Sequence, residues 1–162
     1  MGSANGKPKV FTGRILALSV SAEKGVPKSN VERVELVKDW GIAGDAHAGD
    51  WHRQVSLLAM ESVETMRAKG VDVNPGGFGE NITTGQIPVP QLEVGDRVAL
   101  GAGGVQLEIT QIGKECHTPC AIYHQVGDCV MPREGIFGRV LVGGEVKLGD
   151  PVVVTTSGME TS

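Results

Sequence analysis

The chain has 162 residues and a mass of 17.0 kDa, a size that fits one folded domain. Its formal net charge is −4 and it contains no run of basic residues, which excludes the charge pattern of a nucleic-acid-binding protein. No apolar stretch approaches the roughly 18 residues of a membrane-spanning helix, and residues 1–9 lack the apolar core of a secretory signal. We therefore expect a cytoplasmic protein with neither a membrane nor a nucleic acid as its partner.

The composition favours strands over helices. Val occurs 22 times and Leu 10 times, and β-branched side chains fit a pleated sheet better than a helix. Aromatic residues make up only 4% of the chain, so we expect an aliphatic core. The 24 glycines predict many tight turns or bulges. Together these counts exclude a helical bundle and a coiled coil.

The predicted elements alternate between short strands and turns. In chain order, segments rich in alternating or β-branched residues predict strands over 10–20, 31–37, 53–59, the end of 78–84, 96–100, 105–112, 137–143, 145–149 and 151–155. One helix is predicted from Glu61 to Lys69, with Val63 and Met66 on one face and Gly70 directly after its end.

This succession of elements indicates a single mainly β domain. Eight or so short strands with one or two short helices are typical of a closed or nearly closed β-barrel. No linker divides the chain. We predict one barrel domain over residues 10–155, a flexible N-terminal segment over 1–9 and a flexible C-terminal tail over 156–162.

The segment GKECHTPCAIYHQVGDCVMPR, which begins at Gly113, carries all three cysteines. Thr118 and Pro119 form a helix-start signal, because Thr caps helices and Pro suits the first helical position. Cys120 would then stand where unpaired backbone N–H groups and the helix dipole favour its thiolate. His124 follows four residues later, on the same helix face. We predict a reactive or metal-ligating Cys120; the alternative is a buried, inert cysteine.

Cys116 and Cys129 leave further interpretations open. With Cys120 and His124 they could form a zinc site, although the spacing C-x3-C-x3-H-x4-C differs from the common C-x2-C patterns. Cys129 could instead be a resolving thiol for Cys120, which would make a redox pair. We expect His117 to be solvated.

A second stretch, GIAGDAHAGDWHRQVSLL, places polar residues in a loop before a strand. Asp45, His47 and His52 are either metal ligands or parts of Gly-Asp turns, and the pattern does not decide between the two. Arg53 and Gln54 stand at the junction of loop and strand. An Arg at that position can hold an anion through a two-pronged hydrogen bond.

The third stretch is GGFGEN, in which glycines allow unusual backbone angles and the close approach of a ligand. Glu80 and Asn81 would then present hydrogen-bonding groups. The stretch is not a phosphate-binding P-loop, because no GK[ST] follows it. The alternative is an ordinary turn.

Read together, these stretches resemble the MOSC family, the domain named after the C-terminus of molybdenum cofactor sulfurases. The matching pieces are GIAGDAHAG, RQVSLLA, GFGENITTGQIPV, LEVGDRVAL, LEITQIGKECHTPC and MPREGIFGRVLVGGEVKLGD, in this order. They span about residues 10 to 155, and the chain looks like the short, stand-alone bacterial type. The resemblance implies a strand-rich, MOSC-like barrel. It also implies binding of the molybdenum cofactor (molybdopterin), or of its tungsten form.

The family's key cysteine falls on Cys120, which the resemblance makes either the metal ligand or a carrier of sulfur as a persulfide. A soft thiolate suits both roles. We expect Arg53 and nearby cations to hold the phosphate tail, and His124 to tune the proton of the thiol. The predicted cofactor-binding set is Arg53, Gln54, Asn81, Lys114, Cys120, His124, Arg133 and Arg139.

The resemblance implies a protein that carries, protects or sulfurates the cofactor for delivery to molybdoenzymes, with those enzymes or cofactor-biosynthesis proteins as partners. The chain has no room for the desulfurase domain of the sulfurases, so we do not expect it to generate a persulfide alone. One alternative is a small molybdenum-dependent oxidoreductase acting on N-hydroxylated compounds, although the extra N-terminal segment of the amidoxime-reducing relatives is missing. The other alternative is a zinc-bound or thiol-sensing module.

Overall fold

The computed structural model describes residues 9–23, 28–70, 73–113 and 135–156, and within them strands predominate. The helical elements are α1 (Met60–Ala68) and the short 3-10 helix η1 (Val89–Gln91). The strands are β2 (Val10–Val20), β3 (Ser29–Val31), β4 (Arg33–Val37), β5 (Gly41–Ile42), β6 (Val55–Ala59), β7 (Ile82–Gly85), β8 (Arg97–Leu100), β9 (Val105–Ile112), β10 (Ile136–Val142), β11 (Gly144–Lys147) and β12 (Pro151–Thr155).

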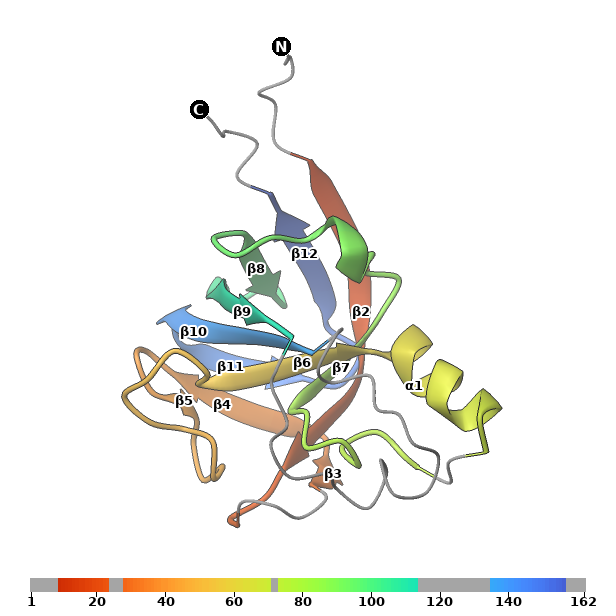
Figure 1. Ribbon diagram of the computed structural model, residues 1–162. Coiled ribbons are helices and arrows are strands. Elements are labelled where there is room, and N and C mark those ends of the chain that lie inside the picture. Colours follow the sequence, from red (N-terminus) through yellow and green to blue (C-terminus); the bar gives the residue numbers. More distant parts are fainter. Residues whose placement is uncertain (1–8, 24–27, 71–72, 114–134, 157–162) are drawn as a thin grey trace.

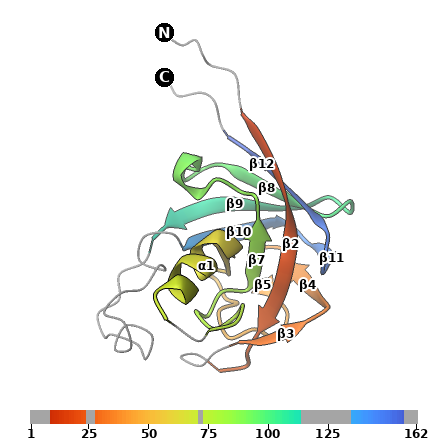
Figure 2. The ribbon, with the colours of Figure 1, turned by 90° about the vertical axis from the view of Figure 1, so that its right-hand side faces the viewer.

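Seven of the described strands close into a barrel (Figures 1 and 2). Hydrogen-bonded neighbours follow the order β12-β8-β9-β10-β6-β7-β2, and β12 pairs with β2 to complete the ring. Neighbours in the ring are antiparallel except β6 and β7, which run parallel. The long strand β2 also carries the short β3 at its end. Closure matters because it pairs the edges that an open sheet would expose.

Alternating burial shows why these sequences form the barrel wall. Along β9, Val105, Leu107 and Ile109 are buried while the residues between them are partly exposed. In a strand, successive side chains point to opposite faces, so every second side chain points into the barrel interior. The interior is aliphatic, as the composition predicts: the buried cluster consists of Ile, Leu, Val and Ala side chains.

A smaller sheet, in the order β11-β4-β5, extends the same core. Val34 and Leu36 of β4 and Val146 of β11 belong to the cluster that fills the barrel. The turn after β4 is fastened to the barrel by a hydrogen bond of 3.0 Å from the Asp39 N–H to the Val140 carbonyl of β10.

Helix α1 is the crossover that two parallel strands require, since it links the end of β6 to the segment before β7. It lies on the outside of the barrel (Figure 2). Leu58 and Phe137 from the outer face of the wall pack there with Val63 and Met66 of the helix, in a second apolar cluster. The helix ends where predicted: Gly70 has a φ of 96°, a left-handed conformation that glycine adopts without strain.

The structure confirms a mainly β barrel with one short α-helix, and it refines the predicted elements. The predicted strand 31–37 is two strands separated at Glu32, whose carbonyl accepts the Leu148 N–H as the chain passes from the barrel to the small sheet. β6 begins at Val55, later than predicted, and β5 and η1 were not predicted. Within the described ranges, no helix is long and apolar enough to span a membrane. The domain boundaries from the sequence stay predictions.

Candidate functional site

Half of the predicted cofactor-binding set lies in the described part of the chain. Arg53, Gln54, Asn81 and Arg139 are described. The others, Lys114, Cys120, His124 and Arg133, lie outside the described residues, as do Cys116, His117 and Cys129. The predictions made for those residues therefore stay predictions.

The two ends of the 114–134 segment meet at the barrel wall. Gly113 donates its N–H to the carbonyl of Gly135 over 2.7 Å. Directly before and after them, Ile112 of β9 pairs with Ile136 of β10, which pairs in turn with Leu57 of β6. The described residues on either side of the stretch that contains Cys120 thus meet between β9 and β10.

Arg53 is held close to this point by aromatic rings. Its guanidinium carbon lies 4.6 Å from the centroid of the Trp51 ring and 5.6 Å from that of Phe137, the second residue of β10. The Trp51 indole is itself fixed by a hydrogen bond of 2.8 Å from Nε1 to the His47 carbonyl. Arg53 Nε is buried and has no hydrogen-bond partner among the described residues. A buried donor of a cationic group without an acceptor is rare in folded proteins and points to a missing anionic partner.

Gln54, the next residue, repeats this feature. Its Oε1 accepts the Val140 N–H over 3.0 Å, which fixes the side chain against β10. Its Nε2 is buried and lacks an acceptor. The structure therefore brings two buried donors without acceptors together in consecutive residues at the start of β6.

Gln111 links the Arg53 loop to the base of the 114–134 segment. Its Nε2 donates to the Gly113 carbonyl over 2.7 Å, and its Oε1 lies 2.7 Å from His52 Nε2. Because a carbonyl only accepts, the Gln111 amide nitrogen must face Gly113, and His52 must donate from Nε2. The hydroxyl of Thr110 adds a further bond to the His52 carbonyl.

Asn81 builds the frame beside this loop. Its Oδ1 accepts the Ser56 N–H over 3.0 Å and the Ser56 hydroxyl over 3.2 Å, and its Nδ2 donates to the Ser19 carbonyl over 3.1 Å. Ser56 pairs with Phe137 across β6 and β10. Asn81 is therefore tied to β6, the strand that pairs with the β10 segment carrying Phe137. The contact with cofactor predicted for Asn81 stays a prediction.

Glu80, its neighbour, is a fully buried carboxylate. It accepts the N–H groups of Gly76 and Phe78, over 2.9 and 3.2 Å, and the hydroxyl of Thr83 over 3.1 Å. Burial raises the pKa of Glu80, and these neutral donors only partly oppose that shift. The GGFGEN stretch is thus a turn organised around its own carboxylate.

Asp45 is the second buried carboxylate, and it forms an ion pair. Lys28 Nζ lies 2.8 Å from Asp45 Oδ1, with both side chains buried. The N–H groups of Ser21 and His47 donate to the same carboxylate over 3.0 Å each. Burial alone would raise the pKa of Asp45, but the hydrogen bonds from Lys28, Ser21 and His47 together lower it. Within the described ranges, no three His, Cys, Asp or Glu side chains are placed to hold a metal ion.

Arg139 lies on β10, two residues after Phe137, so strand alternation places both side chains on the outer face. Its Nε lies 3.4 Å from Asp39 Oδ1, and both groups are about half exposed. Arg139 thus stands on β10 between Phe137, which contacts Arg53, and Val140, which bonds Gln54.

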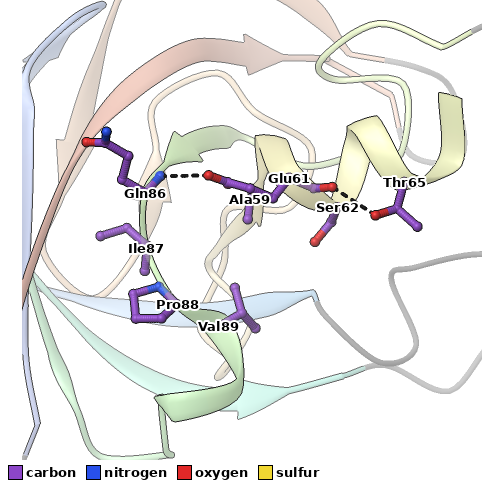
Figure 3. A pocket seen from close by; sticks show the side chains of 8 residues that line it. All are labelled: Ala59, Glu61, Ser62, Thr65, Gln86, Ile87, Pro88 and Val89. Carbon is purple, nitrogen blue, oxygen red and sulfur yellow. Dashed lines mark hydrogen bonds between the residues drawn. The ribbon is translucent and has the colours of Figure 1, made fainter. Parts of the chain in front are cut away.

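A pocket that the sequence did not indicate lies between α1 and the connection from β7 to η1 (Figure 3). Its volume is about 410 Å³. The lining residues are Ala59, Glu61, Ser62, Thr65, Gln86, Ile87, Pro88 and Val89. They come from two segments that meet only in the folded chain and share no motif, which is why no sequence signal could have found the pocket.

The comparisons with known proteins agree with this architecture. A family model, the MOSC domain, matches residues 44–153, which is more than half of the chain. The chain belongs to the MOSC domain family. Membership connects it with the molybdenum cofactor at the level of the family. No match was found among curated proteins.

Solved structures share the fold. The YuaD protein from Bacillus subtilis superposes with a TM-score of 0.78 at 20% identity, covering 92% of this chain and 98% of YuaD. YiiM from Geobacillus stearothermophilus gives 0.65 at 20% identity, covering 88% of this chain and 74% of YiiM. YiiM from Escherichia coli gives 0.60 at 17% identity, covering 92% and 71%. At these identities the likeness concerns the fold alone.

Proposed function

We propose that this MOSC domain protein binds the molybdenum cofactor, or its tungsten form, and carries, protects or sulfurates it for delivery to molybdoenzymes. The observation that carries the proposal is the pair of buried donors without acceptors, Arg53 Nε and Gln54 Nε2. They lie beside the base of the segment that contains Cys120, to which Gln111 ties their loop.

The described residues fit an anionic, oxygen-rich ligand. Arg53 is held in place by Trp51 and Phe137, so little side-chain entropy is lost when it binds a phosphate. Gln54 is fixed by its bond to Val140 and adds an uncharged donor. A phosphate or oxyanion would supply the acceptors that these two buried groups lack.

The remaining roles follow from the chemistry of the residue types. Cys120 is proposed as the metal ligand or the carrier of sulfur, because a thiolate is a soft ligand and a good sulfur nucleophile. Lys114, Arg133 and Arg139 would add positive charge for the phosphate tail, and His124 would handle the thiol proton. Asn81 would hold the strand beneath the site. When bound, the cofactor supplies a redox-active metal centre with dithiolene sulfur ligands.

Measurement of cofactor content tests this proposal. The parent protein, Arg53→Ala, Cys120→Ser and Arg33→Ala would be purified from a host that makes the cofactor, and molybdenum and oxidised pterin fluorescence would be measured per mole of protein. Arg33 is a matched control, because its contact with Glu145 is exposed and 3.4 Å long.

We expect Arg53→Ala to lose pterin and metal together, since a charged hydrogen bond contributes about 1.5–3 kcal/mol, or about ten- to a hundredfold in affinity. Cys120→Ser should lose molybdenum, and Arg33→Ala should retain both. Equal cofactor content in Arg53→Ala and Arg33→Ala would remove Arg53 from the site. Zinc without pterin in the parent protein would overturn the proposal as a whole.

A further inference from the structure

The pocket beside α1 lies at the opposite end of the parallel strands from the Arg53 loop. Arg53 and Gln54 precede β6 and Asn81 precedes β7, whereas the pocket residues Ala59 and Gln86 stand at or after the carboxyl ends of these strands. The pocket is therefore separate from the predicted phosphate contacts. Its lining and charge indicate a ligand of another kind.

The polar groups on the helix side of the pocket carry oxygen acceptors, and Gln86 adds an amide that can both donate and accept. Glu61 accepts the Gln86 N–H at Oε2 over 3.0 Å, and no donor from the described residues occupies its second carboxylate oxygen. Thr65 donates its hydroxyl to the Glu61 carbonyl over 3.0 Å, which leaves the lone pairs of its oxygen available. Figure 3 shows the Ser62 hydroxyl directed into the space between α1 and Val89.

Glu61 gives this pocket its negative charge, whereas Arg14 lines an adjoining cleft that shares Glu61 and Gln86. No Lys or Arg lines the pocket itself, and among the described residues none forms an ion pair with Glu61. The nearest acidic neighbour on the helix, Glu64, differs in this respect, because it pairs with Arg67 over 3.4 Å. Glu61 is thus the carboxylate on α1 that a ligand cation would meet.

The opposite wall of the pocket is apolar. Ile87, Pro88 and Val89 lie across from α1 in Figure 3, and Ala59 closes one end. Ile87 and Val89 are largely buried, so the wall is anchored in the barrel core rather than free to move. A volume of about 410 Å³ falls within the range of small-molecule sites.

We propose that this pocket binds a small primary ammonium ion with an apolar body. The ammonium group has three N–H donors and one positive charge, which match the Glu61 carboxylate and the Thr65 hydroxyl oxygen. The apolar body would cover Ile87 and Val89. This site is independent of the cofactor proposal, because neither its residues nor its ligand belongs to the Arg53 region.

The test uses benzylamine, which is protonated at pH 7, and benzyl alcohol as its neutral counterpart, titrated into full-length cofactor-free protein and followed by amide NMR shifts. We expect saturable shifts at residues 61–65 and 86–89 with benzylamine, with a Kd on the order of 1–10 mM for so small a ligand. Benzyl alcohol should bind at least about fivefold more weakly. Only the benzylamine affinity should fall with added salt, because salt screens exposed charges.

Two matched substitutions locate the binding. Glu61→Gln keeps the acceptor for the Gln86 N–H and removes the charge, and it should weaken benzylamine binding by about three- to tenfold. Glu64→Gln makes the same charge change one turn along the helix and should alter the Kd less than twofold. Amide spectra of both variants report that the fold is intact, and Thr65→Val offers a second, uncharged probe of the same wall.

Any of three results would overturn the proposal: no saturable shift at these residues, equal affinity for amine and alcohol, or equal effects of Glu61→Gln and Glu64→Gln. The protein used contains no cofactor, so failure here leaves the cofactor proposal standing. Loss of cofactor binding in Arg53→Ala would likewise leave this pocket unaffected.

Discussion

Asp45 and Glu80 are both buried carboxylates in loops that enter β6 and β7, yet their pKa values shift in opposite directions. Asp45 has a cation, Lys28, at 2.8 Å, and its pKa is lowered. Glu80 is surrounded by neutral donors, the N–H groups of Gly76 and Phe78 and the Thr83 hydroxyl, and burial raises its pKa. Each carboxylate accepts three hydrogen bonds from other residues, but one of those to Asp45 comes from the Lys28 cation, whereas Glu80 is more deeply buried and has neutral donors.

Each carboxylate organises one side of the Arg53 region. Asp45 binds the N–H of His47, whose carbonyl in turn holds the Trp51 indole against Arg53. Glu80 binds the N–H of Phe78, which packs on the outer apolar cluster that contains Phe137. A buried carboxylate thus fixes the loop before β6 as part of an ion pair, and another fixes the loop before β7 through neutral hydrogen-bond donors.

The largest effect is expected from removing the cation. Lys28→Met would leave the Asp45 carboxylate buried without its charge partner, and removing one member of a buried pair typically costs about 3–5 kcal/mol. Urea unfolding at pH 7 measures the change in the free energy of unfolding. The double variant Lys28→Met with Asp45→Leu should recover much of the loss, because it removes the uncompensated charge as well. A loss below about 1 kcal/mol in the single variant would contradict the ion-pair interpretation.

The pH dependence of Asp45 follows from the sign of its shift. Its folded pKa lies below the ordinary value of 3.8, so its contribution to stability is complete above 3.8 and is lost as the pH falls through the folded pKa. The stability gap between the parent protein and Asp45→Asn should therefore stay constant from pH 7 to pH 5. It should narrow below about pH 3.8.

An intermediate effect is expected at Glu80. Glu80→Gln replaces one acceptor oxygen with an amide that faces the N–H of Gly76 or Phe78, and an unsatisfied buried donor costs about 1–3 kcal/mol. Because the folded pKa of Glu80 is raised above 4.5, the parent protein loses stability as the pH rises from 4.5 through that folded pKa. The difference in the free energy of unfolding between the parent protein and Glu80→Gln should thus be largest at acidic pH and shrink as the pH rises. The pH dependence expected for Asp45→Asn has the opposite sign.

Thermal or urea unfolding across a pH series measures how the stability difference from the parent protein changes with pH for Asp45→Asn and for Glu80→Gln. Glu93 is an exposed acid, so Glu93→Gln changes the net charge by the same amount without removing a buried group. This variant is the control for the change in net charge. If the two stability differences changed with pH in the same direction, the opposite pKa shifts of Asp45 and Glu80 would be contradicted.

The smallest effect is expected at the surface. Arg33 and Glu145 approach to 3.4 Å with side chains 65% and 49% exposed, so water and salt screen their attraction. Arg33→Gln should change the free energy of unfolding by less than about 0.5 kcal/mol, as measured under the same urea conditions as Lys28→Met. A cost comparable to that of Lys28→Met would mean that burial does not separate the two ion pairs.

Much of the fold could be predicted from the sequence, because local patterns determine it. The valine-rich alternation of 105–112 and 151–155 appears as β9 and β12 with the predicted bounds, and the helix ends shortly before Gly70, as expected. The order of the motifs also predicted membership of the MOSC family, which the match over residues 44–153 confirms. Strand β5 escaped prediction because two residues are too few to show a period.

The candidate site was only partly visible in the sequence. Arg53 and Gln54 could be singled out because an Arg at a loop-to-strand junction suits an anion, but their partners could not. Phe137 and Val140 are far along the chain, and only strand pairing between β6 and β10 brings them to these side chains. The same holds for Gln111, which has no motif around it and acts by joining His52 to Gly113.

By itself, then, the sequence determined which segments form strands, where the helix ends and to which family the chain belongs, since these depend on patterns between near neighbours. The tertiary structure alone decided that β12 closes the ring on β2, that β6 and β7 run parallel, and that Lys28 neutralises Asp45 while no cation of the described residues pairs with Glu80. Each of these depends on which groups meet after the chain has folded. The burial of a side chain and the charge of its partner depend on tertiary contacts and not on the local sequence.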